Sequence, residues 1–304
     1  MKKDRQENQK QAEAGAAPNR KERIILTAET GADIPPETAE RYGIHIVPMH
    51  VSFGSETRDD GTFPAEEICA YYERTRALPK TSGSTPEDFN IAFDRIHEQW
   101  PDARILHLAY SSVTTCSYQS AQIASEGRDY VTSLDTKMAS GGQYAIVIRM
   151  AQLLEEHPEW TLEEAVSAAR DLIERARMCF IPDKLEFLRA GGRVSNAAAL
   201  CGKLLSIHPL IEFQNGYLVA ARKLRGKLLA LAPRLVREFT ERQALEKEEV
   251  WLIWSPGFTE ELRSALEQAA SANGFQRITW VKPGGVITRH GGPGAFGVVG
   301  FTRE

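Results

Sequence analysis

The chain of 304 residues lacks several features that would assign it to a chemical class directly. Its four cysteines form no CxxC pair and no cysteine–histidine cluster at metal-ligand spacing, which argues against a disulfide framework and a zinc site. It contains no run of about 18 apolar residues and no signal peptide. Basic residues are not in excess, since 37 Lys and Arg face 41 Asp and Glu, so nucleic acid is not an expected partner. We expect a globular protein of the cytoplasm.

Motifs for nucleotide binding and covalent catalysis are missing as well. There is no GxSxG elbow, no GxxxxGK followed by Ser or Thr, and no GxGxxG between a strand and a helix. His290 has no Asp in its own glycine-rich segment, so acyl transfer is unsupported, although it is not excluded. The sequence predicts no catalytic residue, metal or cofactor.

Residues 1–22 are almost free of large apolar side chains and are predicted to form a disordered polar tail. After the tail, strands and helices alternate, which predicts a mostly parallel sheet with flanking helices. The expected strands are 23–30, 44–53, 103–110 and 129–136, and the expected helices are 33–43, 64–77, 85–100, 118–127 and 141–157. Asp33 is the expected N-cap of the first helix.

The pattern changes after a helix that starts at Thr161, where Thr161 and Glu164 match a capping box. A hairpin is predicted to turn at Asn215-Gly216, and a final strand at 294–301 is expected to tie the C-terminus into a sheet. The fold class predicted is therefore α/β with two domains, a mostly parallel one at 23–161 and a mixed α/β one at 162–304.

Three polar segments, expected to be loops, are rich in hydroxyl groups or glycine: "PKTSGSTP", "YSSVTTCSYQS" and "TRHGGPG". The second follows a strand and precedes a helix, so it is either an anion site at a helix N-terminus or ordinary turn chemistry. The glycines of the third suggest that the backbone around His290 approaches another group closely. The other histidines are interpreted as structural.

Basic residues gather in the second half of the chain, around a Gly-Gly turn followed by an Ala-rich helix and along the next strand. They suit a phosphorylated group or an acidic partner, and the alternative is a solvated charged surface. The candidates are Arg189, Arg193 and Arg225.

Taken together, the segments "ILTAETGADIPP", "RDDGTFPAEEI", "LPKTSGSTPEDF", "SSVTTCSYQSA", "LEFLRAGGRVSNAAALCGKLLSIHPLIEFQNG" and "HGGPGAFGVV" resemble the DegV family, in the order of that family and over nearly the whole chain after the tail. The resemblance implies a two-domain DegV-like α/β fold that encloses one long-chain fatty acid. It further implies a non-enzymatic carrier subunit that presents the acid to an ATP-dependent fatty-acid kinase, which forms an acyl phosphate for phospholipid synthesis. An acyltransferase and the membrane surface are implied as transient partners.

The family's carboxylate site falls on Thr81, Thr115 and His290, with Ser82 and Gly291 beside them. Two hydroxyls and an imidazole N–H would serve as donors to the carboxylate. The family's "TDST" is here "TAET", so that Glu29 replaces a serine and changes the hydrogen-bond support expected near the site. The alternative function is a free-standing hydrolase or small-molecule kinase that uses the same Ser, Thr and His segments.

Overall fold

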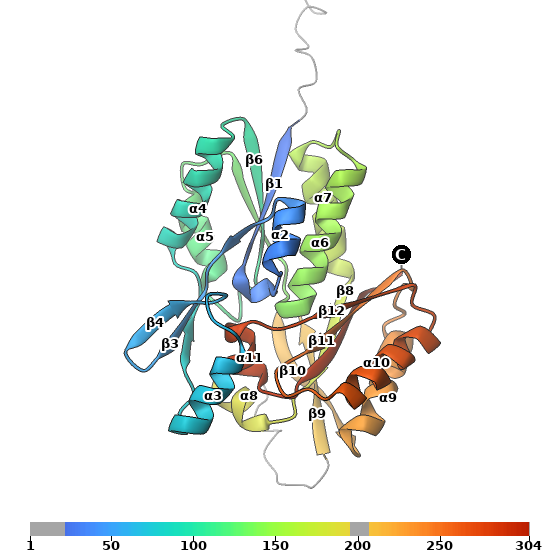
Figure 1. Cartoon of the computed structure of the whole chain (residues 1–304). Coiled ribbons are helices and arrows are strands. Elements are labelled where there is room, and N and C mark those ends of the chain that lie inside the picture. Colours follow the sequence, from blue (N-terminus) through green and yellow to red (C-terminus); the bar gives the residue numbers. More distant parts are fainter. Residues whose placement is uncertain (1–21, 195–206, 304) are drawn as a thin grey trace, which may run out of the picture.

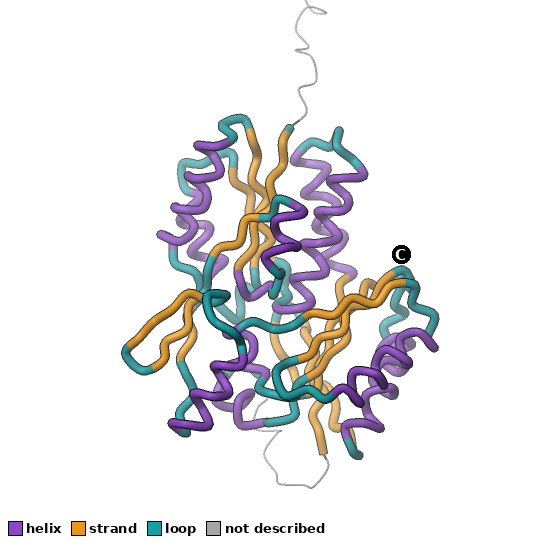
Figure 2. Tube along the Cα trace, viewed as in Figure 1, coloured by secondary structure: helices purple, strands orange, loops and turns teal. Residues whose placement is uncertain are grey.

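The computed structural model describes residues 22–194 and 207–303. Nearly all of the predicted tail, and the Ala-rich helix expected after the Gly-Gly turn, lie outside the described residues. Within them, helices and strands alternate along the chain, as Figure 2 shows.

The first sheet is entirely parallel, as predicted. Its elements are β1 (Arg23–Glu29), β2 (His45–Val47), β6 (Ala103–Ala109), β7 (Val131–Asp135), α2 (Pro36–Tyr42), α4 (Pro86–Gln99), α5 (Ser117–Ser125), α6 (Ser140–Glu156) and α7 (Leu162–Arg175). The strand order is β2-β1-β6-β7. Helices α4 and α5 cover one face of the sheet, and α6 and α7 cover the other (Figure 1). Both faces are therefore buried, as is usual for parallel sheets.

The second sheet is mixed and has the strand order β10-β9-β8-β13-β11-β12. Its elements are β8 (Ala176–Ile181), β9 (Ile207–Gln214), β10 (Tyr217–Arg225), β11 (Glu249–Trp254), β12 (Arg277–Val281), β13 (Phe296–Phe301), α9 (Leu228–Arg242) and α10 (Glu260–Ala272). Strand β13 pairs with both β8 and β11, so the prediction that the C-terminal segment enters a sheet is confirmed.

A third, small antiparallel sheet was not predicted. It has the order β4-β3-β5, and its elements and neighbours are β3 (His50–Phe53), β4 (Glu56–Asp59), β5 (Lys80–Ser82), α3 (Glu66–Thr75), α8 (Leu185–Gly191) and α11 (Gly285–Gly291). The expected single strand 44–53 divides at Pro48, because proline has no N–H for the ladder, and only its first part joins the parallel sheet. The expected loop "PKTSGSTP" begins as strand β5.

The main hydrophobic core joins the two large sheets through α6. This helix contacts β1 and β6 on one side and β8, β11 and β13 on the other. A Cβ at Gly141 in its first turn would lie 2.7 Å from the Ile253 side chain, so the glycine allows the helix to pack closely on the mixed sheet. The two sheets are thus held in a fixed arrangement around the N-terminal end of α6.

Several local predictions are confirmed. The capping box at Thr161 is formed, and the hairpin of β9 and β10 turns at Asn215 and Gly216, which both have positive φ. The prediction for Asp33 is wrong: α2 begins after Pro35, and Asp33 adopts a left-handed conformation with φ 57° before it. Its carboxylate instead accepts hydrogen bonds from the Ser140 hydroxyl and the Gly284 N–H.

Candidate functional site

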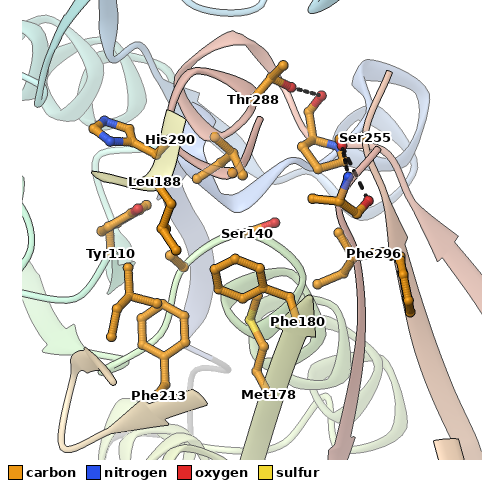
Figure 3. A pocket seen from close by; sticks show the side chains of 17 residues that line it. Tyr110, Ser140, Met178, Phe180, Leu188, Phe213, Ser255, Thr288, His290 and Phe296 are labelled. Atoms are coloured by element: carbon orange, nitrogen blue, oxygen red, sulfur yellow. Dashed lines mark hydrogen bonds between the residues drawn. The ribbon is translucent and has the colours of Figure 1, made fainter. Parts of the chain in front are cut away.

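An apolar cavity of about 60 Å³ lies between the mixed sheet, the N-terminal end of α6 and the helices α8 and α11 (Figure 3). The wall residues from the mixed sheet and α8 are mostly large and apolar: Met178, Phe180, Leu188, Phe213, Leu218, Ile253 and Phe296. The cavity therefore suits a hydrocarbon rather than a polar molecule.

Most hydrogen-bonding side chains on the wall already have partners within the protein. Ser255 Oγ donates to the Gly292 carbonyl at 2.7 Å, and Ser140 Oγ donates to Asp33 Oδ2 at 2.6 Å. His290 is different, because its Nδ1 is buried and has no hydrogen-bond partner in the described part of the chain. The polar end of the cavity is therefore at His290 (Figure 3).

His290 lies on a helix, which corrects the expectation of a glycine-rich loop. Helix α11 spans Gly285–Gly291, and its first turn is held by carboxylates from distant parts of the chain. The Gly284 N–H donates to Asp33 Oδ1 and the Gly285 N–H to Asp60 Oδ1, both at 2.8 Å. A Cβ at Gly285 would lie 2.8 Å from Asp60 Oδ1 and even closer to the Phe63 ring, so this contact requires a glycine.

Both carboxyl groups at this helix end are almost fully buried. Burial raises the pKa of Asp33 well above its usual range, and the nearby charge of Asp60 adds to that effect. Burial likewise raises the pKa of Asp60, although backbone N–H groups partly offset it. The N-terminal end of α11 is thus fixed by groups that hold their protons more tightly than exposed aspartates do.

The sequence-predicted residues Thr81 and His290 are brought together. His290 Nε2 lies 2.9 Å from Thr81 Oγ1 on strand β5. Burial and the positive charges of Arg289 and Arg193 lower the pKa of His290 to about 3, so the ring is neutral near pH 7. The Thr81 hydroxyl can donate to Nε2, and in that tautomer the proton of the neutral ring is on Nδ1. Gly291, which follows on α11, lines the cavity.

Thr115 lies in the same region, next to the chain that follows β5. A Cβ at Gly83 would lie 2.4 Å from Thr115 Oγ1, so the loop before α5 packs directly on this glycine. Ser117 Oγ lies 3.2 Å from Thr115 Oγ1 and accepts the Ser84 N–H at 3.0 Å. Ser82 is exposed, and neither it nor Thr81 or Thr115 forms part of the cavity wall. The structure therefore brings the three polar segments together. The His290 segment reaches the cavity, and so does Tyr110, the first residue of the segment that carries Thr115.

The basic candidates do not form one group. Arg193 is exposed beside the site, and its Nη1 donates to the Gly191 carbonyl at 2.8 Å. Arg189 is exposed on the last turn of α8. Arg225 ends β10, whereas Leu218 near the hairpin turn bridges to Val194. At about 3.3 Å per residue, the strand separates Arg225 from the region of Arg193 by roughly 20 Å.

Sequence reasoning missed Arg289, which precedes His290. Its Nε donates to the Pro79 carbonyl at 2.8 Å and its Nη2 to the Ala190 carbonyl at 3.4 Å. Its Nη1 is buried and has no partner among the described residues. The only sign in the sequence that Arg289 belongs to the site was that it directly precedes His290.

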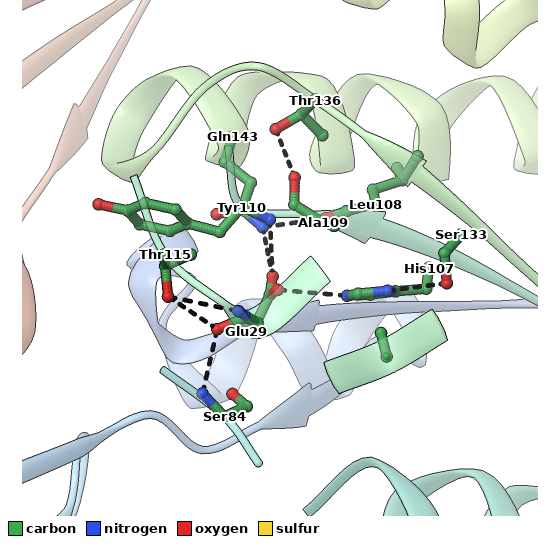
Figure 4. A network of polar contacts seen from close by, with 12 residues as sticks. Glu29, Ser84, His107, Leu108, Ala109, Tyr110, Thr115, Ser133, Thr136 and Gln143 are labelled. Carbon is green, nitrogen blue, oxygen red and sulfur yellow. Dashed lines mark hydrogen bonds and ion pairs between the residues drawn. The ribbon is translucent and has the colours of Figure 1, made fainter. Parts of the chain in front are cut away.

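Sequence reasoning also did not resolve the role of Glu29, which replaces a family serine. Its carboxylate is fully buried and accepts the Tyr110 N–H at 2.9 Å and the Gln143 side chain at 2.8 Å (Figure 4). His107 Nε2 lies 3.4 Å from Glu29 Oε1, an ion-pair distance. Burial raises the pKa of Glu29, but His107 and the hydrogen bonds outweigh it and hold the pKa below its ordinary value. Glu29 thus supports the start of the loop that carries Thr115.

The described residues contain no cluster of three or more His, Cys, Asp or Glu side chains arranged to hold a metal ion. None of the helices in the described ranges combines the length and apolar character needed to cross a membrane.

Comparison with known proteins agrees with this architecture. Residues 23–303 match the family model described as "Uncharacterised protein, DegV family". A DegV domain-containing protein of Deinococcus radiodurans is 30% identical over 281 residues, which cover 90% of this chain and 97% of the relative. A fatty acid-binding protein of Thermotoga maritima is 29% identical, with 90% of this chain and 96% of the relative covered.

Among solved structures, a fatty-acid-binding DegV family protein from Thermus thermophilus superposes with a TM-score of 0.83 at 28% identity. The match covers 92% of this chain and all of that protein. The family model matches nearly the whole described chain, and the relatives and the shared fold agree with that match. The chain therefore belongs to the DegV family.

Proposed function

We propose that the protein is a carrier that binds one long-chain fatty acid, with the hydrocarbon in the apolar cavity and the carboxylate at its His290 end. The ligand would lie between the two domains proposed from the sequence, 23–161 and 162–304. The observation that carries the proposal is a cavity with apolar walls that ends at a buried, unpaired imidazole nitrogen. The relatives from Thermotoga maritima and Thermus thermophilus, both described as fatty-acid-binding, support it.

Burial of the hydrocarbon would supply most of the affinity for such a ligand. Burial contributes about 0.8 kcal/mol per methylene, so a chain of about sixteen carbons gains roughly 12 kcal/mol before the costs of ordering it. The head group needs donors, because a carboxylate removed from water without hydrogen bonds is costly. We place the head group at Thr81, Thr115 and His290, with Ser82 and Gly291 beside them. In this arrangement His290 Nδ1 and the Thr115 hydroxyl donate to the carboxylate, and the Thr81 hydroxyl donates to His290 Nε2 and holds the ring.

We further propose that the carrier presents the acid to an ATP-dependent fatty-acid kinase subunit in the cytoplasm for acyl-phosphate formation. Passage of the product to phospholipid synthesis would involve an acyltransferase and transient contact with the membrane surface. Arg189 and Arg193 border the head-group end and are the candidates for kinase docking or phosphate binding, whereas Arg225 would contact a kinase only through a separate surface.

A hydrolase that uses Thr81 and His290 is less well supported. A nucleophile and base of that kind need a third group that orients the imidazole. Among the described residues, His290 Nδ1 has no such partner, and Gly191 lies against it instead. We therefore favour a carrier without turnover of its own.

Mass spectrometry of ligand extracted from protein purified from a bacterial host tests the proposal. We expect one equivalent of long-chain fatty acid, and rebinding of hexadecanoic or octadecenoic acid after delipidation. Protein that releases no fatty acid and does not bind either acid when it is added would contradict the carrier function.

A further inference from the structure

The proposed head-group site has no positive charge of its own. Thr81 and Thr115 contribute neutral hydroxyl groups, and His290, with a pKa of about 3, contributes a neutral ring. A carboxylate that leaves water for such a site keeps its negative charge without a counter-charge, which is unfavourable even when hydrogen bonds are made. The site therefore needs a nearby cation.

Arg289 is held next to the site by two contacts that leave part of its guanidinium unused. Nε and Nη2 donate to the Pro79 and Ala190 carbonyls, and these contacts fix the group between the segment before β5 and the end of α8. Nη1 remains buried without a partner. A buried guanidinium N–H that lacks an acceptor is unusual in a folded protein.

The unpaired atoms of Arg289 and His290 face the same place. A Cβ at Gly191 would lie 2.6 Å from His290 Nδ1 and 3.6 Å from Arg289 Nη1. The two nitrogens are therefore at most about 6 Å apart, over a glycine that puts no side chain between them. Both are buried and both lack an acceptor among the described residues.

The local charge is also unbalanced. Burial and the charge of Arg193 lower the pKa of Arg289, and the two arginines together lower that of His290. Among the described residues, the hydrogen-bond acceptors of Arg289 and Arg193 are the backbone carbonyls of Pro79, Ala190 and Gly191 and not carboxylates. A bound anion would balance this positive charge.

We propose that Arg289 provides the counter-charge for the ligand's anionic head and that its Nη1, together with His290 Nδ1, makes this end of the cavity selective for an acid over an uncharged lipid of equal length. This inference rests on the proposed fatty-acid binding. It adds Arg289 to the residues that the family resemblance implies, and it separates the roles of the two neighbours: Arg289 supplies charge, and His290 supplies a neutral donor.

The test compares dodecanoic acid with 1-dodecanol at pH 8 by titration calorimetry on delipidated protein. We compare wild type, Arg289→Gln and Arg289→Lys, each checked by thermal unfolding. Arg128→Gln is the control, because Arg128 also donates to a backbone carbonyl, that of Ala124. Neither arginine is part of the cavity wall, but Arg289 lies next to the wall residue His290 and Arg128 does not. The two ligands share their hydrocarbon and differ only in the charged head.

We expect Arg289→Gln to weaken binding of the acid about 10- to 100-fold and to change binding of the alcohol less than about threefold, as for loss of a charged hydrogen bond. Arg289→Lys keeps the charge and should retain most of the preference for the acid. Arg128→Gln should change neither ligand.

Equal weakening of acid and alcohol by Arg289→Gln would overturn the inference and leave Arg289 as a structural link between Pro79 and Ala190. An unchanged ratio of the two affinities would overturn it as well. A wild-type protein that binds neither ligand would instead refute the proposed function itself, and the inference with it.

Discussion

His107, which is fully buried, and His290, which is partly buried, both lie close to the predicted site, and their surroundings differ. The His107 ring has Ser133 Oγ 3.2 Å from Nδ1, and a carboxylate oxygen, Glu29 Oε1, lies at an ion-pair distance of 3.4 Å from Nε2 without forming a hydrogen bond. The His290 ring has Thr81 at Nε2 and no partner at Nδ1 in the described chain. A carboxylate lies beside His107, whereas two arginines lie near His290.

The difference distinguishes the groups around His107, whose contacts stabilise the fold, from the groups around His290, which we expect to contact a ligand. Contacts around His107 and Glu29 are made within the protein, so their loss should affect stability. Unpaired donors around His290 cost stability in the free protein, and a ligand that accepts from them recovers this cost. Substitutions near Glu29 and His107 should therefore lower mainly stability, and substitutions near His290 should lower mainly ligand affinity.

The largest effect is expected for Glu29→Ala. The substitution leaves His107, the Tyr110 N–H and the Gln143 side chain without their buried acceptor. Loss of one member of such a buried cluster typically costs about 3 to 5 kcal/mol. Urea denaturation should show this decrease in the free energy of unfolding.

The matched control for Glu29→Ala is Asp94→Ala, which removes an exposed ion pair with Arg128. An exposed pair contributes about 1 kcal/mol or less. If the two variants lose similar stability, the Glu29 cluster is not a structural support.

The second effect concerns affinity. His290→Ala should weaken fatty-acid binding by about 1 to 3 kcal/mol, because it removes one donor to the carboxylate. Thr81→Ala and Thr115→Ala should each cost somewhat less, since single neutral hydroxyls are lost. Calorimetric titration with hexadecanoic acid measures all three. A purely structural His290 would give the opposite pattern, with a lower melting temperature and unchanged affinity.

The third effect is a contrast in pH dependence. The pKa of Asp33 is raised in the folded protein, so the folded state holds this proton more tightly, and stability falls as pH rises from about 4 through the raised pKa. The pKa of Glu29 is lowered, so its contribution is present above the ordinary value near 4.5 and is lost as pH falls below it.

Urea denaturation between pH 3 and pH 8 checks this contrast with Asp33→Asn and Glu29→Gln. As pH rises, wild type should lose stability relative to Asp33→Asn and gain it relative to Glu29→Gln. Parallel curves for both variants would show that neither carboxyl group titrates differently on folding.

The smallest effect is expected at Arg225. This side chain is exposed at the far end of the hairpin, so Arg225→Ala should leave fatty-acid affinity and stability within about 0.5 kcal/mol of wild type. Arg193→Ala should also leave fatty-acid binding nearly intact and should reduce acyl-phosphate formation with a cognate kinase more than Arg225→Ala does. Equal loss of binding and phosphorylation would place Arg193 in the pocket.

Much of the fold could be predicted from local signals. The signals for the capping box at Thr161, the Asn215-Gly216 turn and the C-terminal strand each lie within a few neighbouring residues. The small sheet was missed because β3 and β5 are only four and three residues long and pair across a helix.

The site depends on contacts that no local pattern encodes. The bond between Thr81 and His290 joins residues 209 positions apart, and only the family resemblance indicated that they belong together. The glycines of α11 favoured a loop, and the helix forms there because Asp33 and Asp60, more than 220 positions earlier, bind its first N–H groups. Arg289 gave no signal beyond its place next to His290.

The most direct test of the central claim is carbon-13 NMR of hexadecanoic acid labelled at the carboxyl carbon and bound to the delipidated protein. The account predicts one bound carboxyl resonance at 1:1 stoichiometry, distinct from free acid, which shifts in His290→Ala and in Arg289→Gln and is unaffected by Arg225→Ala. A bound resonance that is identical in wild type, His290→Ala and Arg289→Gln would contradict the placement of the head group.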